Sequence, residues 1–409
     1  MLTVFNVENT IKNLVIVFFV EKYNTRKKMN KKSFISERAG KVKMAERGYY
    51  AFIPNPLPIE IRFSEKTINL LSEANRLLGE LSGVGRMLPN PYLLVKPAMD
   101  REAILSSKIE GTQSGISDLF FFEADNTSFP ASPDLKEVIN YILALEYGLE
   151  RIKGGFPVCL RLIREIHEKL MLGVRGEHAT PGSFRTTQNW IGQAGCNLES
   201  ATYVPPPENE MNDCLANLEL FIHNNDSNSN IIKLALIHSH FESIHPFVDG
   251  NGRIGRLLII LLMCDWKILS QPLLYLSEFF EKNRDEYYSR LLNINQKGEI
   301  EEWIDFFLYG IKEQAMQSLQ TTNTLIDLQH KYRDKIKGKS ISKATTIILD
   351  HIFTNPIIST KVIIEKYNVN FRTALKAIEN LSELGILFEN TGQRRNRLWV
   401  AKEILNIYK

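Results

Sequence analysis

The stretch His245-Pro-Phe-Val-Asp-Gly-Asn-Gly-Arg-Ile-Gly-Arg256 decides both the fold and the chemistry of this chain. It lies between two apolar segments of helical periodicity, residues 231–243 and 257–266, so the pattern predicts a loop that leads into a helix. Gly250 and Gly252 can adopt positive φ angles, which lets consecutive backbone N–H groups face one oxygen, and the start of the helix adds positive potential. The stretch therefore predicts a phosphate-binding loop.

Four charged or titratable side chains of this stretch suit a nucleotide with several phosphates. Arg253 and Arg256 are three positions apart, so they share one face of the first helical turn and can hold phosphates with forked, permanently charged groups. Asp249 is an oxygen ligand of the kind that Mg²⁺ takes together with substrate phosphates. His245 has an ordinary pKa of about 6.5, which makes it a base at neutral pH. Each signal alone usually marks a plain turn or a solvated helix face, but their combination favours a catalytic site.

The stretch resembles the signature of the Fic/Doc family, His-x-Phe-x-(Asp/Glu)-Gly-Asn-Gly-Arg-x-x-Arg, at every specified position. The likeness extends to residues 52–58 and 182–207 and so covers most of residues 45–310. It implies a mainly α-helical Fic core with a β-hairpin flap, and transfer of AMP from ATP to a Ser, Thr or Tyr hydroxyl of a protein with release of pyrophosphate. Gly252 stands where the kinase-like Doc branch carries Lys, which favours nucleotidyl transfer.

The resemblance also implies a role for each residue of the stretch. His245 would take the proton of the attacking hydroxyl, and Asp249 would hold Mg²⁺ against the α- and β-phosphates. Phe247 would anchor the loop in the core. The residues that would grip the transferring phosphate or neutralise the leaving pyrophosphate are Gly250, Asn251, Gly252, Arg253 and Arg256.

The segment Ser106-x-x-x-Glu110-Gly111 resembles the family's inhibitory motif, (Ser/Thr)-x-x-x-Glu-(Gly/Asn). In relatives the glutamate pairs with the second arginine of the signature, here Arg256, and stops ATP from placing its γ-phosphate productively. The physical reason is that a carboxylate on a forked guanidinium competes directly with phosphate. The alternative is that Glu110 faces solvent near a helix end. The position of the motif before the core implies an N-terminal inhibitory helix that acts within the same chain.

Two segments, residues 188–192 and 201–205, resemble the sides of the family's flap. Such a hairpin would contact the nucleotide through Ile191 and Gly192 and would register a protein target by strand addition, although a plain surface hairpin is the alternative. The positions at which relatives contact adenine are Tyr287, Tyr288 and Asn295. The two tyrosines would be equally well suited to a hydrophobic core.

Proline and glycine residues, together with changes in the hydrophobic periodicity, divide the chain into four regions. They are an N-terminal extension (1–44), a helical region with the inhibitory helix (45–134), the Fic catalytic core (135–335) and a winged helix-turn-helix (336–409). We expect residues 1–28 to be of doubtful status, with Met29 as an alternative start. The winged helix-turn-helix is predicted from helical patterns at 344–351, 360–367 and 371–384 and strand-like runs at 386–389 and 397–401.

The C-terminal region has two competing interpretations. Basic residues of its recognition helix and wing favour duplex DNA as a ligand, whereas Glu379 and Glu383 on the same helix favour a docking or dimer module. The basic residues are Arg372, Lys376, Arg394, Arg395 and Arg397.

Composition and charge exclude several other classes of protein. The 409 residues carry a net charge of only +3, although residues 1–50 hold eleven Lys or Arg against four Glu, so the chain as a whole does not coat a polyanion. Cys159, Cys196, Cys214 and Cys264 form no Cys-x-x-Cys pair, which fits a reducing cytoplasm. The apolar run 14–20 is too short to cross a bilayer and lacks a cleavage site. His238, His240 and His245 do not complete a tetrahedral zinc set, so packing is favoured for the first two.

The sequence thus predicts an ATP- and Mg²⁺-dependent protein adenylyltransferase held down by Glu110, which labels a protein target and itself. A homodimer is compatible with the resemblance. Within the enzyme class, the alternatives are another diphosphate-containing donor or removal of AMP with Glu110 orienting water. Outside that class, the alternative is a DNA-binding regulator with a ligand-sensing Fic core, which the intact His245 and Asp249 disfavour.

Overall fold

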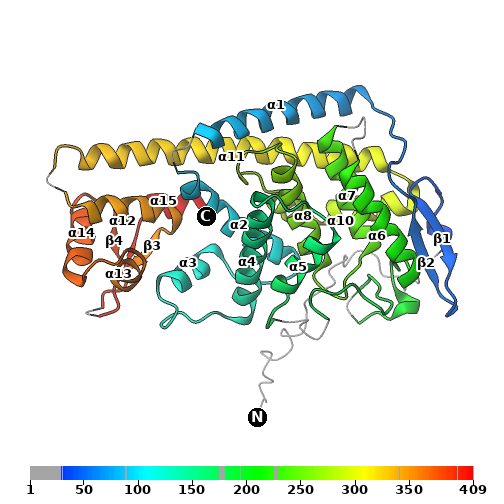
Figure 1. Ribbon diagram of the computed structural model, residues 1–409, viewed down its shortest axis with the longest axis horizontal. Coiled ribbons are helices and arrows are strands. Elements are labelled where there is room, and N and C mark those ends of the chain that lie inside the picture. Colours follow the sequence, from blue (N-terminus) through cyan, green and yellow to red (C-terminus); the bar gives the residue numbers. More distant parts are fainter. Residues whose placement is uncertain are drawn as a thin grey trace, which may run out of the picture.

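The computed structural model shows a mainly helical protein, as predicted (Figure 1). It describes residues 29, 31–87, 90–174, 180–193, 195–224, 229–339, 341–393 and 395–408. Residues 1–28 of the expected extension and Arg394 of the expected wing lie outside the described residues. Within the described part, no helix combines the length and the apolar character needed to span a membrane.

An antiparallel hairpin lies at one end of the molecule, opposite the C-terminal elements (Figure 1). Its strands are β1 (Gly40–Met44) and β2 (Tyr50–Pro54), with Gly40 opposite Pro54 and Met44 opposite Tyr50. The pairing joins residues on both sides of the expected boundary between 44 and 45. That boundary therefore does not separate two structural units, because β1 and β2 form one sheet.

Two long helices run side by side along the molecule (Figure 1). They are α1 (Glu65–Met87) and α11 (Ile300–Ile336). At about 1.5 Å per residue, the 37 residues of α11 extend over roughly 55 Å. This helix therefore runs along most of the molecule to the C-terminal elements (Figure 1).

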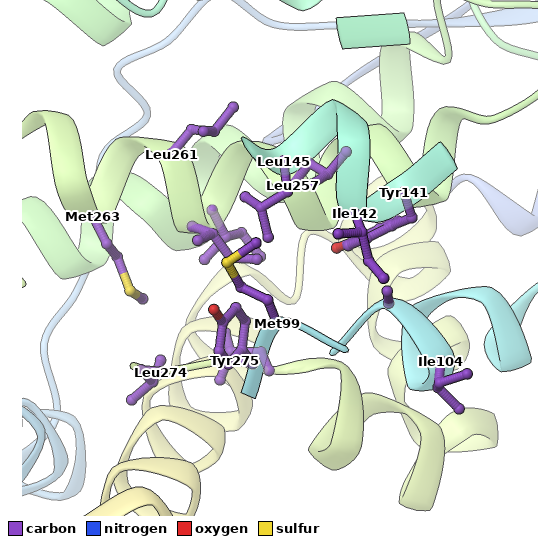
Figure 2. Close-up of a cluster of buried hydrophobic side chains, with 14 of the residues drawn as sticks. Met99, Ile104, Tyr141, Ile142, Leu145, Leu257, Leu261, Met263, Leu274 and Tyr275 are labelled. Atoms are coloured by element: carbon purple, nitrogen blue, oxygen red, sulfur yellow. The ribbon is translucent and has the colours of Figure 1, made fainter. Parts of the chain in front are cut away.

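The core lies where three helices, α2, α4 and α8, meet (Figure 2). Met99 of α2, Tyr141 of α4 and Leu257 of α8 are fully or almost fully buried there and point toward one another. This packing fixes α2, which carries Ser106 of the predicted inhibitory motif, against α8. The helices around the core are α2 (Tyr92–Ile109), α3 (Ile116–Ala124), α4 (Pro133–Lys153), α5 (Leu160–Leu170), α6 (Glu208–His223), α7 (Asn230–Ile244), α8 (Asn251–Asp265), α9 (Ser277–Lys282) and α10 (Arg284–Lys297).

Helix α2 contains a proline, because it begins at Tyr92 and continues through Pro97. The Asn90 side chain accepts a hydrogen bond from the Tyr92 N–H at 3.2 Å. It thereby pairs one N–H group of the first turn that has no partner within the helix. Pro97 is the sixth residue of the helix and lies beyond the first turn, so its ring removes the N–H that would donate to the Leu93 carbonyl.

The C-terminal module, residues 343–408, contains the three helices and two strands that the sequence predicts, together with a third strand and a final helix. Side chains cap the first three helices: Ser342, Ser359 and Asn370 accept hydrogen bonds from the Thr345, Val362 and Thr373 N–H groups, respectively. Its elements are α12 (Lys343–Thr354), β3 (Ile357–Ser359), α13 (Thr360–Tyr367), α14 (Phe371–Glu383), β4 (Phe388–Glu389), β5 (Leu398–Val400) and α15 (Lys402–Tyr408), with sheet order β3-β5-β4. Because α12 packs on α2, the module rests directly on the inhibitory helix.

Candidate active site

The predicted phosphate-binding loop connects α7 to α8, with a left-handed residue at each end. His245 has φ 48° and ψ 61°, and Gly250 has φ 81°. Left-handed backbone costs a residue with a side chain roughly 1–2 kcal/mol, whereas glycine adopts it freely. The loop at His245 is therefore held in place by its surroundings rather than by local preference.

Asn251 closes the loop instead of pointing into the cavity. Its side-chain carbonyl accepts from the Phe247 N–H, and its side-chain NH₂ donates to the Phe247 carbonyl, both at 2.8 Å. The side chain is almost fully buried. The predicted grip of Asn251 on phosphate therefore rests on its backbone, because its amide group is already paired within the loop.

Phe247 anchors the loop in the core and stacks on His167 of α5, with ring centroids 3.7 Å apart and an interplanar angle of 7°. The Nδ1 atom of His167 accepts from the Gly182 N–H at 2.9 Å, so Nε2 carries the proton and donates to the Asp249 carbonyl at 3.0 Å. Burial lowers the pKa of His167 to about 4, which keeps the ring neutral. His167 supports the loop from 82 residues away, and the pattern of the sequence carried no sign of it.

His245 is neutral in this environment. Burial, followed by the nearby Arg185 guanidinium, lowers the pKa of His245 to about 4. Its Nδ1 lies 3.4 Å from the Glu242 carbonyl, so that nitrogen carries the proton and Nε2 is left to accept one. The predicted base is therefore in its accepting form at neutral pH.

Arg256 is held by the inhibitory motif, as the resemblance implied. Its Nε donates to the Ser106 hydroxyl at 2.8 Å, and its Nη2 donates to the Ser106 carbonyl at 2.9 Å and to Glu110 Oε1 at 2.7 Å. Burial disfavours the Glu110 carboxylate, but Arg256 more than offsets this and holds the pKa of Glu110 below its usual range. Gly111 continues the chain at φ 103°, a conformation that requires glycine.

Glu110 also lies directly against the loop. A Cβ atom placed on Gly252 would be 2.3 Å from Glu110 Oε1, closer than any real contact. The glycine thus leaves room for a carboxylate at the position where the loop would meet a phosphate. Burial raises the pKa of the neighbouring Glu242 to about 8, so this second carboxyl is uncharged at neutral pH and adds no repulsion there.

The two arginines of the stretch have different surroundings. Arg253 is 1% exposed and donates to Glu137 of α4 at 2.9 Å. Its Nη2 is 3.8 Å from Asp249 Oδ1. Arg253 does not line the cavity that Arg256 lines, so its charge acts on a phosphate only from behind the loop.

A cavity of about 520 Å³ brings most of the predicted residues together. Asn295 is tied to Ser243, and the Tyr287 hydroxyl pairs with His238 at 2.8 Å, so both are structural as well as cavity-lining. His238 is thereby part of the packing. The predicted residues that line the cavity are Glu110, Ile191, Gly192, His245, Asp249, Gly250, Asn251, Gly252, Arg256, Tyr287, Tyr288 and Asn295.

The flap is less regular than a hairpin. Its two sides meet at one antiparallel bridge between Ile191 and Tyr203, where the Ile191 N–H donates to the Tyr203 carbonyl at 2.9 Å. Trp190 beside the bridge is 41% exposed. Bends and turns take the place of longer strands, since Gly192 and Gly195 interrupt the β-forming residues.

Comparison with known proteins agrees with this geometry. Residues 68–150 match the model of the Fic/DOC family N-terminal region, and residues 157–263 match that of the Fic/DOC family. The chain contains a Fic/DOC family domain. The first match contains Ser106 and Glu110 and the second contains the loop from His245 to Arg256, whereas the cavity residues between 284 and 295 lie beyond both matches.

Curated relatives and one solved structure extend the comparison. The chain is 27% identical over 177 residues to the protein adenylyltransferase Fic of Drosophila grimshawi and 24% identical to that of Drosophila melanogaster. Each match covers 42% of this chain, but only about a third of the relative. A Fic family protein from Desulfovibrio desulfuricans G20 shares the fold, with a TM-score of 0.54 and 17% identity over 83% of this chain and 97% of that one.

Proposed function

We propose that this Fic/DOC protein transfers AMP from ATP to a hydroxyl of a protein and releases pyrophosphate. The observation that carries the proposal is the pairing of Arg256 with Glu110 inside the cavity that also contains His245. A guanidinium held by a carboxylate is a phosphate site that is already filled by a competitor. The relatives named protein adenylyltransferase support the same reaction.

Each of these residues has a separate role in the proposed reaction. The hydroxyl oxygen of the target attacks the α-phosphorus of ATP, and its proton passes to Nε2 of His245. The bond from the α-phosphorus to the oxygen that bridges to the β-phosphate breaks, and pyrophosphate leaves with that electron pair. The backbone of Gly250 and Gly252 and the Arg256 guanidinium stabilise the charge that develops, as phosphoryl-type transfer requires.

The cavity fits Mg²⁺ bound mainly by the nucleotide. The described residues contain no group of three or more His, Cys, Asp or Glu able to hold a metal ion. Asp249 supplies one carboxylate at the cavity, and its Oδ1 accepts from the Gly250 N–H at 2.6 Å. One carboxylate together with phosphate oxygens is a usual set for Mg²⁺, which would neutralise the α- and β-phosphates when bound.

Inhibition by Glu110 belongs to the same proposal. With Glu110 on Arg256, the γ-phosphate of ATP meets a guanidinium that is already paired. Removal of the side chain frees Arg256 for the phosphate. The alternatives within the enzyme class, another nucleotide donor and removal of AMP with Glu110 orienting a water, use the same cavity and differ in the ligand and the product.

The partners follow from the surfaces around the cavity. A protein segment that pairs with the flap would bring its hydroxyl to His245, and self-modification, a homodimer and a cytoplasmic location are parts of the same proposal. Duplex DNA remains a candidate ligand of the C-terminal module. There, Arg372 and Lys376 are exposed on α14, although Glu379 and Glu383 are exposed on the same helix.

Intact-mass spectrometry tests the proposed function. The Glu110→Gly protein is incubated with Mg²⁺ and, separately, ATP, GTP, CTP or UTP, beside the wild type and the Glu110→Gly,His245→Ala double variant. We expect an added AMP with ATP that is weaker in the wild type and missing from the double variant. An adduct with another nucleotide would establish a different donor, and an adduct that persists in the double variant would remove His245 as the base.

A second part of the same experiment tests for an enzyme that labels only its protein target. A lysate of the source cells is added with isotopically labelled ATP, and labelled bands are compared between the Glu110→Gly protein and the double variant. Labelling that requires His245 supports the transferase. If neither arm shows transfer, the regulator interpretation with a ligand-sensing core gains the support that the enzyme loses.

A further inference from the structure

Arg185 is an arginine buried without a carboxylate. It lies after α5, at the base of the flap, and is 1% exposed. Among the described residues no carboxylate forms an ion pair with it. Its partners are all backbone carbonyls: Nε donates to His245 at 2.9 Å, Nη2 to Pro206 at 2.6 Å and to Ile244 at 3.4 Å, and Nη1 to Thr187 at 3.3 Å.

These carbonyls belong to two different segments. Thr187 and Pro206 lie at the two sides of the flap base, whereas Ile244 and His245 form the end of α7 and the left-handed turn. The backbone N–H of Arg185 adds a further link, because it donates to the Pro246 carbonyl at 2.9 Å. One side chain thus joins both sides of the flap to the residue that would act as the base.

Asn189 of the flap makes a second link to the same turn. Its side-chain NH₂ donates to the His245 carbonyl at 3.1 Å and to the Phe247 carbonyl at 2.8 Å. The His245 carbonyl therefore receives donors from both Arg185 and Asn189. Two donors on one carbonyl explain how a residue with a side chain is kept in the left-handed conformation that presents its imidazole to the cavity.

We propose that Arg185 is a positioning residue that fixes the flap and the His245 turn as one unit, so that a target registered on the flap meets the base at a set distance. The inference rests on the proposed transfer reaction and adds a specific residue to it. A buried guanidinium suits this role because its five donors diverge in a rigid plane and can serve several carbonyls at once. A lysine offers a single ammonium and cannot span both segments.

The buried charge has a second consequence at His245. A cation beside the imidazole disfavours its protonation, and burial acts in the same direction. Glu110 acts in the opposite direction, and no other side-chain charge is a main influence on the ring. The other charged or titratable groups that line the cavity are Cys196, Tyr203, Glu242, Asp249, Arg256, Arg284, Tyr287 and Tyr288. Loss of the Arg185 charge is therefore expected to raise the pKa of His245.

The test compares three variants in the Glu110→Gly protein, which also serves as the parent. We expect Arg185→Met to lower the rate of AMP transfer by about 100-fold, within the range that a positioned general base contributes. ATP affinity, measured by titration calorimetry, is expected to stay within about threefold of the parent because Arg185 does not line the cavity. The acid limb of the pH–rate profile is expected to move to higher pH.

The other variants separate positioning from charge. Arg185→Lys keeps the charge but loses most of the hydrogen bonds, so we expect a reduced rate with an unmoved acid limb. Asn189→Ala is expected to lower the rate by about tenfold, also with an unmoved limb. Arg164→Met, at an exposed arginine of α5 near the flap base, is the matched control and is expected to match the parent in both measurements.

Several outcomes would overturn the inference. They are an unmoved acid limb in Arg185→Met, parallel loss of ATP affinity and rate, or a full rate in Arg185→Lys. If Arg185→Met does not fold, Arg185→Lys and Asn189→Ala decide, and parental rates in both reject positioning. If the Glu110→Gly parent itself transfers no nucleotide, the proposed reaction fails, which is a distinct result from any of these.

Discussion

The catalytic loop is held from two sides, and each side uses an arginine in a different way. On the flap side, Arg185 donates only to carbonyls, which carry no net charge and cannot leave. On the side of the inhibitory helix, Arg256 donates to a carboxylate, Glu110, and to Ser106. Phosphate can replace a carboxylate on a guanidinium, whereas no ligand of the cavity can replace backbone carbonyls. The flap side is therefore built as a permanent support and the inhibitory side as an exchangeable one.

Arg253 provides a third case between these two. Its partner Glu137 is a carboxylate, as for Arg256, but both side chains are almost fully buried, as for Arg185. A ligand in the cavity cannot displace Glu137 from Arg253, because neither residue lines the cavity. The Arg256 pair differs from the Arg253 pair by its place on the cavity wall, where the Glu110 side chain is 22% exposed.

The largest effect is expected when the pair of Arg253 and Glu137 is broken. We expect Arg253→Met to lower the free energy of unfolding by about 3–5 kcal/mol, because it removes a buried cation that pairs with the Glu137 carboxylate. Urea denaturation measures this loss. The Glu137→Gln,Arg253→Met double variant is expected to recover part of it, and a loss below about 1 kcal/mol in the single variant would show that the pair is not structural.

How far the sequence predicted this arrangement depends on the distance between partners along the chain. The loop from His245 to Arg256 carries its chemistry in consecutive residues, so its position between two helices and the pairing of Arg256 with Glu110 were predicted from motifs. His167, Arg185 and Glu137 were not, because a single buried polar residue in an ordinary segment has the same pattern as an exposed one. Their roles depend on which distant backbone groups the tertiary fold brings to them.

The irregular segments show the same limit in the fold. Three helical patterns and two strand-like runs predicted the C-terminal module closely, because each element has its own period and cap. The strands β1, β2 and β3 were not predicted, since short strands gain their definition from the partner strand and not from their own residues. Within residues 182–207, one bridge between Ile191 and Tyr203 stands where the sequence predicted a hairpin.

A change of pH is expected to alter the free energy of unfolding through the buried histidines. Burial and Arg185 lower the pKa of His245 to about 4, and burial lowers the pKa of His238 to about 3. The unfolded chain binds protons on these rings near pH 6.5 while the folded chain does not, so the contribution of these two histidines to stability falls as the pH falls from about 6.5 toward 4. We expect about 1 kcal/mol per histidine between pH 7 and 5.5, measured by denaturation at each pH.

Glu110 has its own pH window. Its pKa is lowered by Arg256, so its contribution is present above about pH 4.5, the usual value for a glutamate, and is lost only as the pH falls below it. Glu110→Gln is therefore expected to show the same loss of stability between pH 7 and 5.5 as the wild type. A smaller loss in that variant would mean that Glu110 and not the buried histidines titrates in this range.

The smallest effect is expected at Ser106, which holds Arg256 without charge. Ser106→Ala leaves the Arg256 Nε without its acceptor, but the Ser106 carbonyl and Glu110 still accept from Nη2. Loss of one such bond weakens the inhibited state by about 1 kcal/mol, or roughly fivefold in the rate of self-labelling by the wild type. In the Glu110→Gly background the same change is expected to give no further rise, because the inhibitory contact is already gone. An equal rise in both backgrounds would place Ser106 outside the switch, since coupled residues do not add.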